Sequence, residues 1–197
     1  MITVAVAMGL TTLGGRAEAG IVVNIEQVGA NVVTTGSGSI DLSVLSQVGT
    51  GGSESLVWAA EGWVFVGALS SDKVYTGLTG PSSFGTGGGP IFPTGNTGTG
   101  DGFGIEASFS SFGKPTLYLP EAYVSGSVIS GFATYDNTTI AALGLAPGTY
   151  TYTATGVGNT FTVNIGSVPE PSSLTMATTA VGLFGGLAFY RRRRIKG

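Results

Sequence analysis

Short runs of β-branched and aromatic residues, each bounded by Gly, Pro, Asn or Asp, recur through the central part of this chain. The runs are IVVNIEQV, NVVTTGSG, WVFVGAL, GIEASFSSF, PTLYL, YVSGSVISGFATY, GTYTYTAT and NTFTVNIG. Such side chains fit the pleated surface of a β-sheet, and the residues between the runs favour turns. Gly29 and Ala30 separate the first two runs and predict a hairpin. Only NTTIAALGL, residues 137–145, resembles a helical turn. We therefore expect an all-β fold over residues 20–167, an antiparallel two-sheet sandwich of the jelly-roll-like kind.

The run from Thr149 to Thr153 alternates strictly between threonine and tyrosine. Successive side chains of a strand point to opposite faces of the sheet, so this run predicts a half-buried strand with tyrosines on one face and threonines on the other.

Glycine is abundant, with 35 residues, and is concentrated at Gly49–Gly52 and in residues 84–104. Segments with so few side chains have little to bury and lose much entropy on ordering, so we expect surface loops there, with a long Gly-rich loop over 84–104. A phosphate-binding loop is not indicated, because no P-loop lysine follows and no helix start is signalled.

The last thirty residues place a proline-rich spacer, an apolar span and a basic cluster in a fixed order. Residues 174–190 form a run of 17 residues without a charge, and Arg191–Arg194 follow directly. As a helix the run would extend about 26 Å, which is enough for a thin bilayer core. Because arginine clusters stay on the cytoplasmic side, the span predicts a C-terminal transmembrane helix with the body of the protein exported. An apolar helix packed on a soluble core is the alternative.

The first nineteen residues have the features of a secretory signal peptide. An uncharged apolar stretch precedes Ala17-Glu18-Ala19, in which Ala17 and Ala19 provide the small residues of a signal cleavage site. The mature chain would then begin near Gly20. The positively charged n-region is missing, so a start further upstream is expected. A buried first strand is the alternative.

Val168-Pro169-Glu170-Pro171, followed by the apolar span and the arginine cluster, resembles the PEP-CTERM sorting signal of exported bacterial proteins. The resemblance implies recognition by an exosortase, a membrane-embedded cysteine-dependent enzyme, with cleavage close to Pro169–Pro171. It also implies delivery to the cell surface or an exopolysaccharide matrix. Residues 123–166, with the turn Leu145-Ala146-Pro147-Gly148-Thr149-Tyr150, are similar to the C-terminal half of many PEP-CTERM-bearing extracellular domains. A permanent tail anchor remains an alternative.

Composition limits the chemistry available to the body of the chain. There is no cysteine and no histidine, so an ordinary catalytic triad, a thiol nucleophile and a zinc site are excluded. Residues 20–167 contain two lysines against nine acidic residues, a net charge of −7, which disfavours nucleic-acid binding. Asp101 and Glu106 are the nearest carboxylate pair for glycosidase-like chemistry, but their spacing places them on opposite faces of an extended chain. We expect no enzymatic activity and no cofactor or metal site.

Binding is the main alternative to a purely structural role. Trp58, Trp63 and Tyr75 could form an aromatic platform for sugars, although Trp63 in WVFV is expected to pack in the core. Asp101 alone falls short of the oxygen ligands that calcium requires, and it suits a turn. Asn137-Thr138-Thr139 is a formal glycosylation sequon that a surface turn explains equally well. The sequence therefore predicts a secreted surface or matrix protein with a structural or adhesive role, and the alternative is a lectin-like carbohydrate-binding module.

Overall fold

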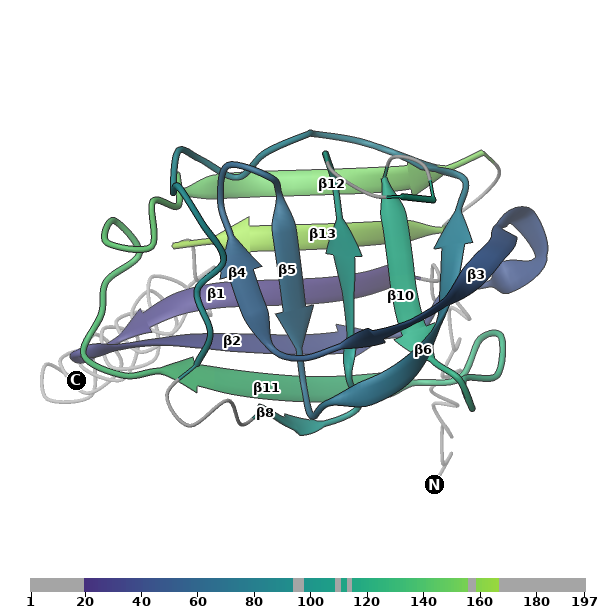
Figure 1. Cartoon of the computed structure of the whole chain (residues 1–197), viewed down its shortest axis with the longest axis horizontal. Helices are drawn as coiled ribbons and strands as arrows, with labels where there is room; N and C mark the ends of the chain where they lie inside the picture. Colours follow the sequence, from purple (N-terminus) through teal and green to yellow (C-terminus); the bar gives the residue numbers. More distant parts are fainter. Residues whose placement is uncertain (1–19, 94–97, 109–110, 113–114, 156–158, 167–197) are drawn as a thin grey trace, which may run out of the picture.

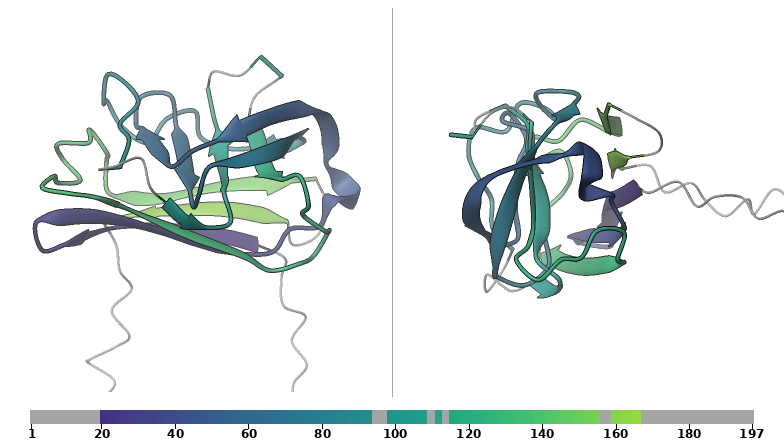
Figure 2. Two further views of the ribbon diagram at one scale, coloured as in Figure 1. Left: turned by 60° about the horizontal axis from the view of Figure 1, so that its bottom comes forward. Right: turned by 90° about the vertical axis from the view of Figure 1, so that its right-hand side faces the viewer.

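The structure, a computed structural model of the whole chain, describes residues 20–93, 98–108, 111–112, 115–155 and 159–166. The described residues form thirteen strands in two sheets that face each other (Figures 1 and 2), with one short 3-10 turn at Leu42–Val44. The prediction of an all-β, two-sheet, sandwich-like fold is confirmed. No helix in this part of the chain has the length and apolar character needed to cross a membrane.

One sheet has seven strands in the order β7-β12-β13-β1-β2-β11-β8. Their bounds are Gly20–Val28 (β1), Asn31–Gly38 (β2), Leu78–Thr79 (β7), Gly98–Gly100 (β8), Ile129–Tyr135 (β11), Gly148–Ala154 (β12) and Thr160–Ile165 (β13). The other has six strands in the order β3-β6-β10-β9-β5-β4. Their bounds are Ser46–Ser53 (β3), Leu56–Trp58 (β4), Trp63–Val66 (β5), Ser70–Thr76 (β6), Phe103–Glu106 (β9) and Thr116–Pro120 (β10).

The expected hairpin between the first two strands is present. β1 and β2 pair over eight residue pairs, and Gly29 at the turn has a φ of 62°, which glycine adopts without strain. One pairing corrects the antiparallel prediction, because β1 and β13 are parallel neighbours from Gly20↔Thr160 to Ile25↔Ile165. Parallel strands need a long connection, and here the whole domain forms that connection.

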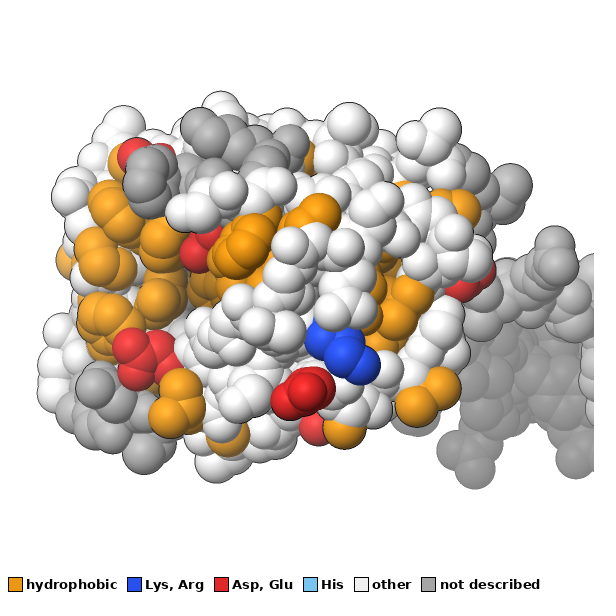
Figure 3. All heavy atoms as spheres, turned by 45° about the vertical axis from the view of Figure 1, so that its right-hand side comes forward, with side chains coloured by type: hydrophobic (Ala, Val, Ile, Leu, Met, Phe, Trp, Pro, Cys, Tyr) orange, Lys and Arg blue, Asp and Glu red, His pale blue; other side chains and the backbone are white. Residues whose placement is uncertain are grey.

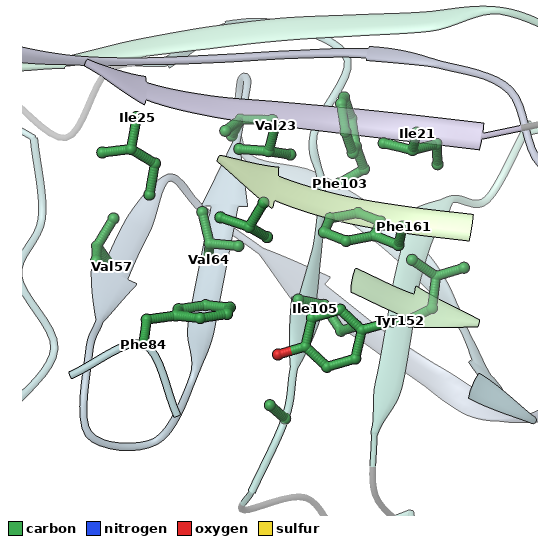
Figure 4. Packing of buried hydrophobic residues seen from close by; sticks show 14 of the residues in the cluster. Ile21, Val23, Ile25, Val57, Val64, Phe84, Phe103, Ile105, Tyr152 and Phe161 are labelled. Carbon is green, nitrogen blue, oxygen red and sulfur yellow. The ribbon is translucent and has the colours of Figure 1, made fainter. Parts of the chain in front are cut away.

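The core lies between the inner faces of the two sheets. Figure 4 shows Ile21, Val23 and Ile25 of β1 opposite Val57 and Val64 of the six-stranded sheet, with the rings of Phe103 and Phe161 in the same buried cluster. The alternation predicted for residues 149–153 is confirmed, because Tyr152 is fully buried while Thr149, Thr151 and Thr153 are exposed.

Two glycine-rich segments differ from expectation. Gly49–Gly52 belong to strand β3 instead of a loop, because aromatic rings occupy the space that their missing side chains leave. An added Cβ at Gly49 would lie 2.5 Å from the ring of Phe112, and one at Gly51 would lie 3.1 Å from the ring of Tyr118.

Residues 84–104 are only in part the predicted surface loop. Phe84 is fully buried in the core, Ile91 forms a β-bridge with Val57, and the segment ends in strands β8 and β9. The predicted turn at 137–145 is present, with Leu143 N–H donating to Thr139 O.

Candidate functional site

The predicted processing residues lie outside the described residues. These are Ala17 and Ala19 of the signal cleavage site, the sorting motif Pro169, Glu170 and Pro171, the span 174–190, and the cytoplasmic stop Arg191, Arg192, Arg193 and Arg194.

The structure brings together two of the three aromatic residues proposed as a sugar platform. Trp58 and Trp63 are cross-strand partners on β4 and β5, with ring centroids 5.1 Å apart in an edge-to-face arrangement. Tyr75 points to the opposite face of the sheet and belongs to the main core. The expectation that Trp63 packs in the main core is wrong, because Trp63 alternates with Val64, and it is Val64 that points inward.

The tryptophans belong to a second apolar cluster on the outer face of the six-stranded sheet. We call it the outer aromatic cluster, and it comprises Leu56, Trp58, Trp63, Phe65, Val74 and Tyr118. Phe65 and Tyr118 pack edge to face at 5.2 Å, and Tyr118 Oη donates to Glu106 Oε2 at 2.9 Å. Phe65 is only 3% exposed, so the cluster is a packed unit and not an open platform. Figure 3, which looks obliquely onto this sheet, shows hydrophobic side chains gathered on part of its surface.

Asp101 and Glu106 have different partners, in agreement with the expectation that they do not converge. Asp101 Oδ2 accepts from Ser130 N–H at 3.0 Å, and Asp101 N–H donates to Ser130 O at 2.7 Å. Asp101 therefore ties the turn between β8 and β9 to the start of β11. Within the described ranges, no group of three or more His, Cys, Asp or Glu side chains is placed to hold a metal ion.

Asn137, the first residue of the sequon, is exposed in the turn that follows β11. It has a φ of 51°, and its N–H donates to Asn31 Oδ1 at 2.9 Å. Asparagine tolerates this left-handed conformation better than most residues, so the turn accounts for Asn137 without a modification.

Asp72 on β6 is a buried carboxylate that the sequence did not single out. Its Oδ1 accepts from Ser70 Oγ, and Oδ2 has no hydrogen-bond partner among the described residues. Burial raises the pKa of Asp72 above its ordinary value, and the neighbouring hydroxyls of Ser53 and Ser70, which lie 3.2 Å apart, partly oppose this shift. Nearby Ser70 Oγ also lies 3.2 Å from Gly102 O. The arrangement binds β3, β6 and the start of β9 together.

The outer face of the seven-stranded sheet carries hydroxyl and amide side chains, and we call it the hydroxyl face. One row of cross-strand partners crosses six adjacent strands: Thr149, Asn164, Asn24, Thr35, Phe132 and Thr99. A second row runs beside it: Thr151, Thr162, Val22, Ser37 and Ser130. At a strand spacing of about 4.8 Å, the first row is about 24 Å long.

A shallow groove of about 430 Å³ lies on this face across β1, β2, β11 and β8. Its walls include the side chains of Asn24, Thr35, Ser37, Ser130 and Phe132, and no charged side chain of the described residues lines it. The Phe132 ring is 49% exposed between its cross-strand partners Thr35 and Thr99.

A hydrogen-bond relay along the row fixes the amide at the edge of the groove. Thr149 Oγ1 donates to Asn164 Oδ1 at 3.0 Å, and Asn164 Nδ2 donates to Asn24 Oδ1 at 3.0 Å. The Asn24 carbonyl oxygen thus accepts from Asn164, on the side away from Thr35. Among the described residues, no hydrogen bond is made by the two N–H donors of Asn24 Nδ2.

Sequence reasoning missed this groove because its residues come from four separate strands. Alternation of threonine and tyrosine in residues 149–153 was the one signal that pointed to a hydroxyl-bearing face. Comparisons of the chain with protein-family models, with curated proteins and with solved structures found no match.

Proposed function

We propose that this chain is an exported protein of the cell surface or of a biofilm exopolysaccharide matrix, with a structural or adhesive role. An exosortase sorts and cleaves it through residues 168–197. In this proposal residues 1–19 direct export, and the body is a jelly-roll-like sandwich outside the cell. A transmembrane helix over 174–190 holds the precursor in the inner membrane, with Arg191–Arg194 in the cytoplasm.

The observation that carries the proposal is the order of the three elements at the end of the chain. Proline fixes its own φ and disfavours helix in the residue before it, so Pro169 and Pro171 would favour an extended stretch, as a protease cleft requires. The uncharged span and the arginines that follow would hold it at a fixed depth in the membrane.

The position of the last strand is compatible with such processing. β13 ends at Ile165, and Gly166 N–H donates to Ile25 O at 2.8 Å. Pro169 lies three residues beyond Gly166 and therefore after the last strand. Cleavage near the motif would leave all the described strands in the released body.

Pro169→Ala combined with Glu170→Ala tests the sorting step in a host that makes an exosortase. We expect the variant to keep its C-terminal segment and to stay in the membrane fraction, while the parent protein appears outside the cell with a shorter C-terminus by intact mass. Pro90→Ala, at an exposed proline outside the motif, is the matched control. An unchanged mature mass in the double variant would contradict the proposal.

A second candidate function is carbohydrate binding, and the hydroxyl face favours it. The groove combines uncharged hydrogen-bonding side chains with one exposed aromatic ring, and such a lining can contact both the hydroxyl groups and the C–H groups of an uncharged sugar. The outer aromatic cluster does not favour it to the same degree, because most of its ring surface is buried.

A further inference from the structure

We propose that the groove on the hydroxyl face binds an extended, uncharged polysaccharide chain, which lies across the strands along the row from Asn24 to Thr99. This inference deepens the carbohydrate-binding candidate function and rests on it. Three features of the groove support it: the chemistry of its lining, the fixed Asn24 amide and the exposed Phe132 ring.

The lining favours an uncharged ligand rich in hydroxyl groups. Thr35, Ser37, Thr99 and Ser130 each offer a hydroxyl that both donates and accepts, and within the described part of the chain no lysine, arginine or carboxylate lines the groove. A polyanion would find no counter-charge there, in a body whose net charge is −7. From Asn24 to Thr99 the row crosses four strands, about 14 Å at a spacing of about 4.8 Å, and it continues beyond the groove to Asn164 and Thr149. This length fits several residues of an extended chain better than a single small molecule.

Asn24 provides donors whose direction is set before the ligand arrives. The relay through Asn164 fixes its carbonyl oxygen, so the amide does not have to be ordered on binding. A preorganised donor on a central strand costs less entropy to engage than one on a loop.

Phe132 provides the apolar surface that a sugar ring needs on one face. Sugars carry C–H groups as well as hydroxyls, and an aromatic ring flanked by hydroxyls can contact both kinds of group. Phe132 lies between Thr35 and Thr99 at the same level of the sheet, and nearly half of its surface is accessible.

A second copy of the chain is a poorer occupant. The interfaces of stable homodimers have apolar centres, and Val22 and Phe132 are the only large apolar side chains among the described residues that line the groove. Water would have to be removed from many hydroxyls for little apolar contact.

Affinity electrophoresis of the full chain tests the site. The protein is solubilised in a polyoxyethylene detergent, which carries no sugar, and run in gels that contain a neutral polysaccharide (dextran, xyloglucan or galactomannan) or an anionic one (alginate). The variants are Phe132→Ala and Asn24→Asp. Asn24→Asp keeps the oxygen that accepts from Asn164 but removes the two N–H donors. Phe92→Ala, which removes a ring that is 40% exposed outside the groove, is the matched control.

We expect at least one neutral polysaccharide to retard the parent protein and the Phe92→Ala variant. Phe132→Ala and Asn24→Asp should each weaken the apparent affinity by about fivefold to tenfold. Unchanged circular dichroism of both variants would show that the fold is retained.

Three results would overturn the inference, and they are distinguishable. Retardation by neutral polysaccharide that both variants retain would place carbohydrate binding elsewhere and leave the candidate function standing. Retardation by none of the neutral polysaccharides, or by alginate alone, would exclude the ligand class. A dimer in sedimentation that Phe132→Ala dissociates would assign the groove to a second copy. None of these results bears on sorting, which the intact mass of the mature protein tests separately.

Discussion

The outer faces of the two sheets have opposite characters, although both point away from the core. The face of the six-stranded sheet carries the outer aromatic cluster, whose members pack on one another until Phe65 is almost completely buried. The hydroxyl face of the seven-stranded sheet leaves threonine, serine and a half-exposed Phe132 open to solvent. An outward position in a sheet therefore does not determine exposure. We infer that one face contributes to stability and that the other is available for binding.

Removing a ring from each face should give the largest contrast. Phe65→Ala is expected to lower the free energy of unfolding by about 3–5 kcal/mol, because it opens a cavity in a packed cluster. Phe132→Ala should lower it by less than about 1 kcal/mol, since that ring is half exposed already.

Urea unfolding measures both effects. Tryptophan fluorescence reports on the outer aromatic cluster, since both tryptophans of the chain belong to it, and circular dichroism reports on the sheets. Equal losses in the two variants would erase the proposed difference between the faces.

The next effect concerns the strand beneath the groove. An added Cβ at Gly36 would lie 2.8 Å from Phe103 Cζ and 2.9 Å from Val66 Cγ2, both in buried side chains. Gly36→Ala is therefore expected to cost about 1–3 kcal/mol of stability through overpacking. A thermal unfolding midpoint equal to that of the parent would mean that the core under the hydroxyl face is loosely packed.

Asp72 should give a smaller effect that depends on pH. Its pKa is raised in the folded state, so the unfolded chain loses this proton at a lower pH than the folded chain does. Stability should therefore fall as the pH rises from about 4 through the raised pKa, and then level off.

Asp72→Asn keeps an oxygen that accepts from Ser70 and removes the buried charge. We expect its thermal midpoint at pH 7 to exceed that of the parent by about 2–4 °C, with the difference shrinking below pH 4. Glu121→Gln, at an exposed carboxylate, is the control. A gain that persists undiminished at pH 3 would argue against charge as the cause.

The smallest effect is expected on the hydroxyl face away from the groove. Thr151 is exposed on β12, so Thr151→Lys should change the free energy of unfolding by less than about 0.5 kcal/mol. If urea unfolding shows that Thr151→Lys lowers the free energy of unfolding by more than about 1 kcal/mol, the hydroxyl face around Thr151 is covered by other residues and is not open to solvent.

The sequence correctly predicted those elements whose structure depends only on residues close to them in the chain. The hairpin at Gly29 and the alternation in residues 149–153 depend only on neighbouring residues, and both predictions are confirmed. The assignment of Trp63 to the core was wrong because WVFV is apolar on both faces, so its sequence does not show which side faces inward. Its strand partners decide this, since Trp58 and Glu106 lie on the same face as Trp63.

Contacts between distant segments account for the rest. Gly49–Gly52 form part of a strand because rings of Phe112 and Tyr118, more than sixty positions away in the sequence, occupy the space beside the glycines. The groove is likewise absent from any single stretch of sequence, because strands β1, β2, β8 and β11 each contribute only one or two of its side chains that can form hydrogen bonds.

The parallel pairing of β1 with β13 has a mechanical consequence. Gly20 begins one strand and Ile165 ends its neighbour, so a pull that separates these two points acts along both strands in opposite directions. The hydrogen bonds between these two strands would then be loaded in shear, all at the same time. In unzipping, by contrast, such bonds break one after another. If force were applied between the two ends of the domain, at Gly20 and Ile165, the strands that receive the force, β1 and β13, would also be the pair that resists it most strongly.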